Sequence, residues 1–123
     1  MAVARLGTIA LDCPDPRALA AFYMAVLGGT VKDGDGDDDE WVETAGYEGT
    51  PLAFQRVEGH VPPEWPSSEK SQQFHLDLTV EDQDAAETEV LALGATLLDK
   101  GEAGRTWRVY ADPAGHPFCL CAC

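Results

Sequence analysis

Hydrophobic and polar positions along the first half of the chain predict one strand, one helix and three further strands. An extended run at residues 6–12 precedes a helix whose apolar residues recur at helical spacing over residues 19–27. Asp-Pro stands before this helix as a capping pair, and Gly-Gly follows it as a stop signal. Strands are then expected at residues 30–31, 41–44 and 51–57.

The second half repeats this order after a proline-rich segment at residues 59–71. A strand over residues 74–80 precedes a helix that Asp82 caps and Gly94 ends. Three more strands are expected, at residues 95–98, 105–111 and 117–122, the last of them after a turn of sequence Asp-Pro-Ala-Gly.

The two halves can be superposed on each other. Cys13 corresponds to Val80 at an offset of 67, and the last strands correspond at 64, which matches Gln55 with Cys119. A four-stranded sheet with one covering helix leaves its other face open, so two such sheets side by side would enclose one cavity. We predict a single α+β domain over residues 1–123, in which two tandem βαβββ modules (residues 1–58 and 72–123, joined by a linker at 59–71) form a cup-shaped mixed sheet.

Three stretches carry a resemblance to a known family. They are residues 11–28, which begin Leu-Asp-Cys-Pro-Asp-Pro, residues 74–80, which begin Phe-His-Leu-Asp, and the Asp-Pro-Ala-Gly-His-Pro-Phe of residues 112–118. In them the chain resembles the vicinal oxygen chelate superfamily, and in particular its glyoxalase-like and bleomycin-resistance proteins. The resemblance implies the glyoxalase/bleomycin-resistance fold, and it specifies the reaction hardly at all.

The resemblance also implies where a metal would bind. Enzymes of the family hold a divalent metal with four strand residues, two per module, and the matching positions here are Thr8, Gln55, His75 and Cys119. Hard divalent ions need oxygen donors, preferably charged, and zinc needs three or four good donors, whereas threonine is a weak neutral ligand. We therefore expect no metal or other cofactor, with a divalent metal at these positions as the alternative.

Charge and composition narrow the range of partners. Eight Lys and Arg against 22 Asp and Glu give a net charge of −14, which repels nucleic acid and attracts small cations. Six of the eight residues at 33–40 are acidic and predict a solvated loop. No apolar run approaches the roughly 18 residues of a membrane span, and no secretory segment opens the chain, so we expect a cytoplasmic protein with free thiols and no membrane partner.

Aromatic residues supply the remaining candidates for a binding site. Trp41 and Trp107 lie on corresponding strands and are expected to face each other across the cavity, and Trp65 lies in the linker, where no core explains it. Aromatic rings offer flat apolar surface and can hold cations over their faces. The expected ligand-binding residues are therefore Thr8, Trp41, Gln55, Trp65, His75, Trp107, Tyr110 and Cys119.

Two classes of function remain open. The first is a non-catalytic binding protein of the bleomycin-resistance type, which sequesters a drug-like or natural-product ligand, aromatic or cationic, without metal. The second is an enzyme: a glyoxalase-like lyase or a dioxygenase whose metal uses His75 and Gln55, or a metal-free enzyme with His75 as base. A homodimer is expected because members of the family commonly pair modules across chains, and two-fold dimers are the commonest small oligomers.

Overall fold

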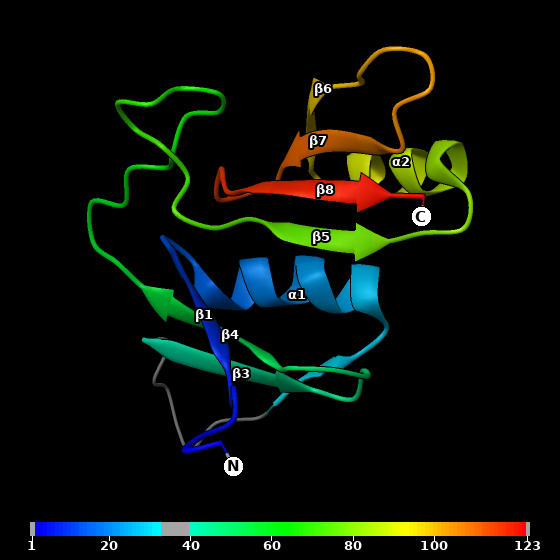
Figure 1. Cartoon of the computed structure of the whole chain (residues 1–123). Helices are drawn as coiled ribbons and strands as arrows, with labels where there is room; N and C mark the ends of the chain where they lie inside the picture. The colour runs from blue at the N-terminus through cyan, green and yellow to red at the C-terminus, as the bar shows by residue number, and fades with distance from the viewer. Residues whose placement is uncertain (1, 33–39, 123) are drawn as a thin grey trace. The chain divides into compact units, whose positions relative to one another are not determined.

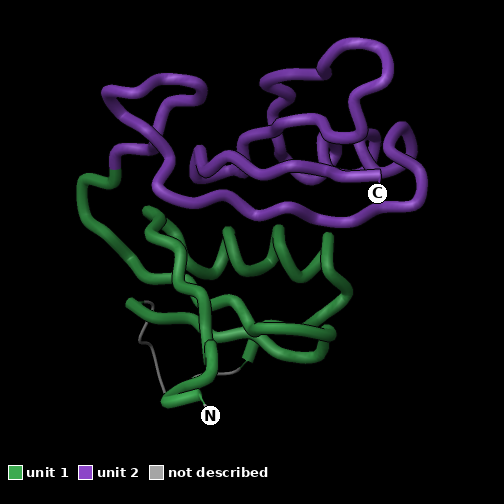
Figure 2. The backbone as a smooth tube through the Cα atoms, viewed as in Figure 1, with its two compact units in different colours: residues 1–60 green, residues 61–123 purple. Residues whose placement is uncertain are grey.

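The computed structural model describes residues 2–32 and 40–122, and the predicted acidic loop falls largely outside them, at residues 33–39. The chain divides into two compact units, Met1–His60 and Val61–Cys123 (Figure 2). Each unit is one βαβββ module with a four-stranded sheet, which confirms the predicted α+β class and element order. The proline-rich segment from residue 61 onward belongs to the second unit.

The first unit contains one mixed sheet with a helix on one face (Figure 1). Strand β1 runs parallel to β4, and the β4–β3 and β3–β2 pairs are antiparallel, in the order β1-β4-β3-β2. The elements are β1 (Ile9–Cys13), α1 (Pro16–Leu27), β2 (Thr30–Val31), β3 (Trp41–Ala45) and β4 (Leu52–Arg56).

Helix α1 begins and ends as its sequence predicts. The Asp15 side chain accepts a hydrogen bond from the Ala18 N–H, with an N–O distance of 3.2 Å, and Gly28 ends the helix at a φ of 86°, a left-handed conformation that glycine adopts without strain. Helix α1 packs through buried apolar side chains against the sheet of its own unit. Tyr23, for example, stacks on Phe54 of β4 at 5.8 Å between ring centroids.

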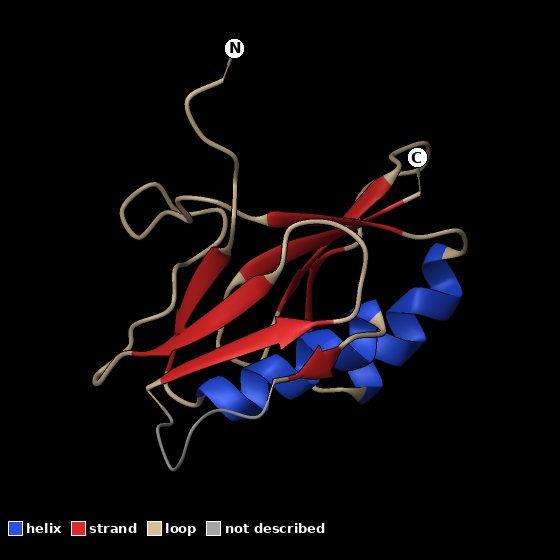
Figure 3. Cartoon of the chain, turned by 90° about the horizontal axis from the view of Figure 1, so that it is seen from below, coloured by secondary structure: helices blue, strands red, loops and turns tan. Residues whose placement is uncertain are grey.

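The second unit repeats this topology with the strand order β5-β8-β7-β6, in which β5 runs parallel to β8. Its elements are β5 (Leu76–Thr79), α2 (Gln83–Ala92), β6 (Thr96–Asp99), β7 (Trp107–Ala111) and β8 (Pro117–Cys121). Figure 3 shows the strands of both units in red and the helices in blue. All ten elements lie where the hydrophobic pattern places them, with ends shifted by at most a few residues.

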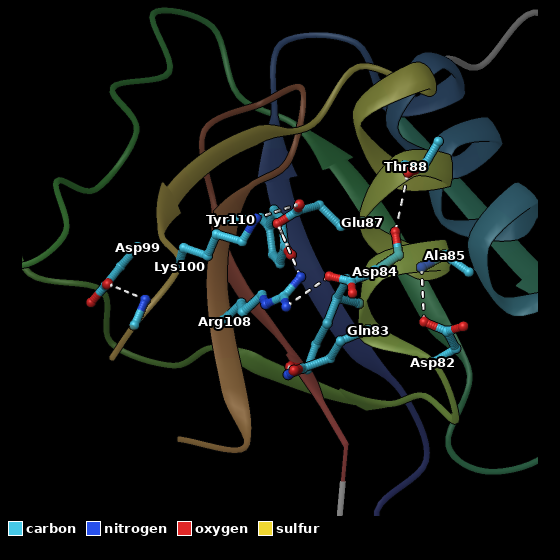
Figure 4. A network of polar contacts seen from close by, with 12 residues as sticks. Asp82, Gln83, Asp84, Ala85, Glu87, Thr88, Asp99, Lys100, Arg108 and Tyr110 are labelled. Carbon is cyan, nitrogen blue, oxygen red and sulfur yellow. Dashed lines mark hydrogen bonds and ion pairs between the residues drawn. The ribbon is translucent and has the colours of Figure 1, made fainter. Parts of the chain in front are cut away.

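A network of polar contacts joins helix α2 to its sheet (Figure 4). Arg108 of β7 pairs with Asp84 at 2.9 Å and with Glu87 at 3.5 Å, and the Tyr110 hydroxyl donates to Glu87 at 2.8 Å. The Gln83 side-chain amide donates to two backbone carbonyl groups of the strand region, at 2.7 and 2.9 Å. The buried residue of this helix is Val90. Charged and polar side chains thus help to attach α2 to its sheet, whereas α1 is attached through buried apolar side chains.

The strand register corrects one detail of the predicted repeat. Ile9 pairs with Leu52, and Leu76 pairs with Phe118, so the last strands of the two units correspond at an offset of 66 and not 64. Ala53 is therefore the residue equivalent to Cys119. A shift of two residues leaves every side chain on the same face of its strand, so the predicted faces are unaffected.

Among residues 2–32 and 40–122, no helix combines the length and the apolar character required to cross a bilayer.

Candidate functional site

The second sheet presents two chemically different faces. Side chains alternate along a strand, so Arg108 and Tyr110 of β7 point toward α2, and Trp107 and Val109 point to the opposite side. Directly paired residues share a face, and Val109 pairs with Cys119, which in turn pairs with Asp77. We call this face of the second sheet, opposite α2, the site face.

Three donor groups meet on the site face and form what we call the polar cluster: His75, Asp77 and Cys119. Their nitrogen, oxygen and sulfur ligand atoms all lie within 4.8 Å of one another. His75 Nε2 lies 3.1 Å from Asp77 Oδ1, and the Cys119 thiol also forms a hydrogen bond with Asp77. Asp77 thus contacts both the imidazole of His75 and the thiol of Cys119. His75 and Asp77 are exposed, whereas Cys119 is only 6% exposed.

Burial controls the chemistry of the cysteine in the polar cluster. Burial first, and the Asp77 carboxylate second, raise the pKa of the Cys119 thiol from an ordinary 9.0 to about 12. A thiol with this pKa is protonated at neutral pH and is a poor nucleophile, because the thiolate is the reactive form. In the metal-free protein, Cys119 therefore acts as a small apolar group and hydrogen-bond donor.

Apolar and aromatic groups complete the site face. Trp65, from the proline-rich segment, packs against Val109, Cys119 and Cys121 and is half-buried. Trp107 is 45% exposed, and the Arg105 guanidinium carbon lies 4.9 Å from the centroid of its ring.

Arg105 holds Trp107 in place. Its Nε donates to the Trp107 carbonyl at 2.9 Å, and its Nη1 pairs with Asp99 Oδ2 at 3.1 Å. The hydrogen bond from Arg105 holds the pKa of Asp99 below its usual value, so the pair stays ionised. The Trp107 ring therefore has a guanidinium over it that is itself paired with Asp99.

The first unit carries two of the predicted residues on one face of its sheet. Trp41 of β3 pairs with Gln55 of β4, both are exposed, and the Trp41 indole N–H donates to Glu43 at 3.2 Å. Thr8 is also exposed and immediately precedes β1. Gln55 pairs with Asp12, four residues beyond Thr8, so about 13 Å of strand separates Thr8 from Gln55.

The structure brings together some of the predicted residues and separates others. His75 and Cys119 meet in the polar cluster, with Trp65 and Trp107 on the same face, and Trp41 lies beside Gln55. Thr8 does not lie beside Gln55.

Tyr110 is separated from the other predicted residues by its side of the sheet. It is fully buried on the α2 side, it stacks on Phe118 at 5.5 Å, and burial raises the pKa of its hydroxyl. Tyr110 lies three positions after Trp107, an odd number, so strand alternation already places the two on opposite faces. Its inclusion with Trp107 in one binding surface is thereby corrected.

Sequence reasoning missed Asp77 and Arg105. Asp77 stands two residues after His75 in an alternating strand, so its position on the same face could have been read from the period of the strand. The contact of Arg105 with the Trp107 ring depends on a local turn, and no comparable signal in the sequence indicates it.

Comparison with known proteins identifies relatives across nearly the whole chain. The model of a family described as glyoxalase-like domain matches residues 8–121. No curated protein matches the sequence at a significant level. Several solved structures match in fold, at sequence identities from 14% to 20%.

Three of these structures illustrate the range of proteins that share this fold. A glyoxalase/bleomycin resistance protein/dioxygenase family enzyme from Burkholderia phytofirmans PsJN matches with a TM-score of 0.70 and 19% identity, over 95% of this chain and 97% of that one. The bleomycin-binding protein of Streptomyces verticillus, in complex with copper(II)-bleomycin, gives 0.59 and 19%, over 99% of each chain. The trypanothione-dependent glyoxalase I of Leishmania major gives 0.68 and 19%, over 97% and 86%.

Proposed function

The chain belongs to the glyoxalase-like domain family, within the vicinal oxygen chelate superfamily, and we propose that it binds and sequesters a small aromatic molecule of drug-like or natural-product type, without metal and without chemical change. The observation that carries this proposal is the site face of the second sheet. There, two tryptophans flank a small group of hydrogen-bonding side chains. A few polar groups among aromatic surface are typical of sites for organic ligands.

The tryptophans supply the apolar part of such a site. Trp107 remains 45% exposed although Arg105 lies over its ring, so a planar ligand can cover an indole that already has one neighbour in contact. Covering a preordered side chain avoids most of the entropy cost of fixing it on binding. Stacking of aromatic rings contributes about 0.5–1.5 kcal/mol beyond the area buried.

The negative charge of the chain favours a cationic ligand. The net charge of −14 attracts cations to the whole chain, and the exposed Asp77 carboxylate offers a local partner on the site face. Arg105 already occupies one side of Trp107, so we assign the contact of that ring to an aromatic group of the ligand and the contact of Asp77 to its cationic group.

The metal positions implied by the family fit a metal poorly in the first unit. Thr8 offers a neutral hydroxyl and Gln55 a neutral amide. Gln55 pairs with Asp12, which lies four positions after Thr8, so about 13 Å of strand separates the two. Divalent ions prefer carboxylate, imidazole or thiolate ligands held close together. Sequestration needs no such metal, and the protonated Cys119 thiol does not favour nucleophilic chemistry either.

Fluorescence titration tests the proposal. We use metal-free bleomycin and the planar cation proflavine as probes, and we expect saturable quenching of tryptophan emission together with a raised thermal midpoint. Trp65→Ala and Trp107→Ala should weaken binding, while Leu97→Ala, an exposed apolar control paired with Tyr110 on the α2 side, should not. Equal binding by both tryptophan variants and the wild type would place the site elsewhere.

One observation favours a second function, metal-free catalysis with His75 as base. Asp77 lies 3.1 Å from His75 Nε2 and so leaves Nδ1 to accept a proton, an arrangement in which a carboxylate orients an imidazole. Mass spectrometry of the ligand recovered after denaturation separates the two functions. An unchanged mass supports sequestration, whereas a mass shift that His75→Ala abolishes supports catalysis.

The proposal includes a homodimer, as the resemblance to the family implies. Static light scattering should give about twice the chain mass of 13.2 kDa at micromolar concentration. A mass that stays at that of one chain over this range would contradict the dimer.

A further inference from the structure

The polar cluster combines three donors that the strands themselves place. Asp77 on β5 pairs directly with Cys119 on β8, and His75 lies two residues before Asp77, so alternation puts all three on the site face. Backbone pairing therefore fixes the spacing of Asp77 and Cys119, and His75 directly precedes β5. The ligand atoms of the three residues lie within 4.8 Å of one another.

The donors have a particular chemical preference. A ring nitrogen, a carboxylate oxygen and a sulfur are ligands that zinc accepts together, whereas magnesium and calcium do not take sulfur. Zinc binds such atoms at about 2.0–2.3 Å in tetrahedral geometry, which leaves them about 3.5 Å apart. Small rotations of three side chains close the difference from the present spacing.

The contacts of Asp77 show what a cation would replace. Asp77 Oδ1 lies 3.1 Å from His75 Nε2, and the Cys119 thiol forms a hydrogen bond with Asp77, so one carboxylate already contacts both other donors. A metal ion among these groups would bond to the same three ligand atoms and release the thiol proton. Val109 and Trp65, packed against Cys119, would shield the metal–sulfur bond from water.

We propose that the second module by itself binds one thiophilic divalent ion, zinc in the first place, through His75 Nε2, an Asp77 carboxylate oxygen and Cys119 Sγ. The site shares two positions with the set that the family implies, but its third ligand, Asp77, is not one of them, and it needs nothing from the first module. Three protein ligands leave a fourth position for water. Organic-ligand binding as proposed above does not require this ion, and the ion would compete with the cationic group of an organic ligand for the Asp77 carboxylate.

Cobalt(II) titration of the purified, metal-free full chain tests the site. Thiolate-bound cobalt(II) gives a near-ultraviolet charge-transfer band, and we expect this band to saturate at one equivalent and to disappear when zinc is added. Cys123 is replaced by serine in every protein, so that the terminal thiol does not contribute. Cys119→Ser should abolish the band, and Asp77→Asn and His75→Ala should each weaken cobalt binding by at least about tenfold.

Cys121→Ser is the matched control. Cys121 lies on the same strand and the same face, is also buried, and lies outside the polar cluster, so this variant should keep the band at full intensity. The proposal is overturned if the parent chain, which carries only Cys123→Ser, shows no saturable band, or if the band survives Cys119→Ser or is lost in Cys121→Ser. Circular dichroism checks the fold of each variant, and the exposed positions 75 and 77 provide variants that do not disturb the core.

The cobalt experiment is distinguishable from the test of the proposed function. Trp107→Ala should leave the cobalt band intact while it weakens proflavine binding. Conversely, if the chain binds cobalt as expected but binds neither proflavine nor bleomycin, the metal-site proposal is supported and the sequestration proposal is wrong.

Discussion

The two modules have one topology but are stabilised in different ways. Helix α1 buries six residues, among them Leu19, Phe22 and Tyr23, and packs against the sheet of its own unit as an apolar layer. Helix α2 buries Val90 and is held by Arg108, which bridges to two acidic residues of the helix. The order of elements therefore does not determine the kind of interaction that holds the layers together.

The open faces of the two sheets differ more than the helices do. In the register of the structure, the equivalents of His75, Asp77 and Cys119 in the first module are Thr8, Ala10 and Ala53. Ala10 pairs with Ala53 as Asp77 pairs with Cys119, so two methyl groups stand where the second module has a carboxylate and a thiol. The donor chemistry of the chain is thus concentrated in one module.

Substitutions in the two helices should give the largest difference in the free energy of unfolding. Leu19→Ala removes a side chain that is 1% exposed, and we expect the free energy of unfolding to fall by about 2–5 kcal/mol. Leu91→Ala on α2, at 40% exposure, should change it by less than about 0.5 kcal/mol. Urea denaturation measures both values. Equal losses would show that α2 also depends on apolar packing.

Removal of the charged bridge should have an intermediate effect. Arg108→Met keeps much of the side-chain volume but removes the shared cation of Asp84 and Glu87. Glu87, which is mostly buried, then keeps only its pair with Lys100 at 3.6 Å, and we expect a loss of about 1–2 kcal/mol. Lys32→Met, which breaks an exposed pair with Glu43 in the first module, should cost about 0–0.5 kcal/mol. If urea denaturation gives the two variants the same stability, the bridge does not hold α2.

Alkaline pH should destabilise the metal-free chain through Cys119. Its folded-state pKa of about 12 lies above the ordinary 9.0, so the unfolded chain loses this proton first and stability falls as pH rises above 9. One such group contributes a slope of at most about 1.4 kcal/mol per pH unit. The slope between pH 9 and pH 10, from urea denaturation, should be smaller for Cys119→Ser than for the unsubstituted chain. An identical slope for Cys119→Ser would contradict the raised pKa.

The smallest effect is expected on proflavine affinity, when two equivalent tryptophans are replaced. Trp41 pairs with Gln55, and Trp107 pairs with Cys121, so they occupy corresponding positions in the two sheets. Trp107→Ala should weaken proflavine binding by about 0.5–1.5 kcal/mol beyond its lost area, and Trp41→Ala should weaken it less, because Trp41 lacks the stacked arginine within the described residues. Fluorescence titration gives both affinities. A larger effect of Trp41→Ala would move the binding surface to the first module.

The sequence by itself determined the order of elements and the faces of the strands. The caps at Asp15 and Asp82 and the two hydrophobic periods depend on local interactions, so both helices and all eight strands lie close to their expected places. Strand alternation is equally local. The predicted offset between the last strands was wrong by two residues, and an even error keeps His75 and Cys119 on one face. The same period, applied to residues 107 and 110, would have separated Tyr110 from Trp107.

Only the tertiary structure decided which residues of distant strands meet. The pairing of Asp77 with Cys119 joins strands separated by more than 30 residues, and its register depends on the packing of the whole module. The same holds for the bridge from Arg108 to α2 and for the stacking of Trp65 on Val109, Cys119 and Cys121. Local propensity and alternation give each strand two faces, but the contacts that create a site arise from non-local pairing, which no short stretch of sequence encodes.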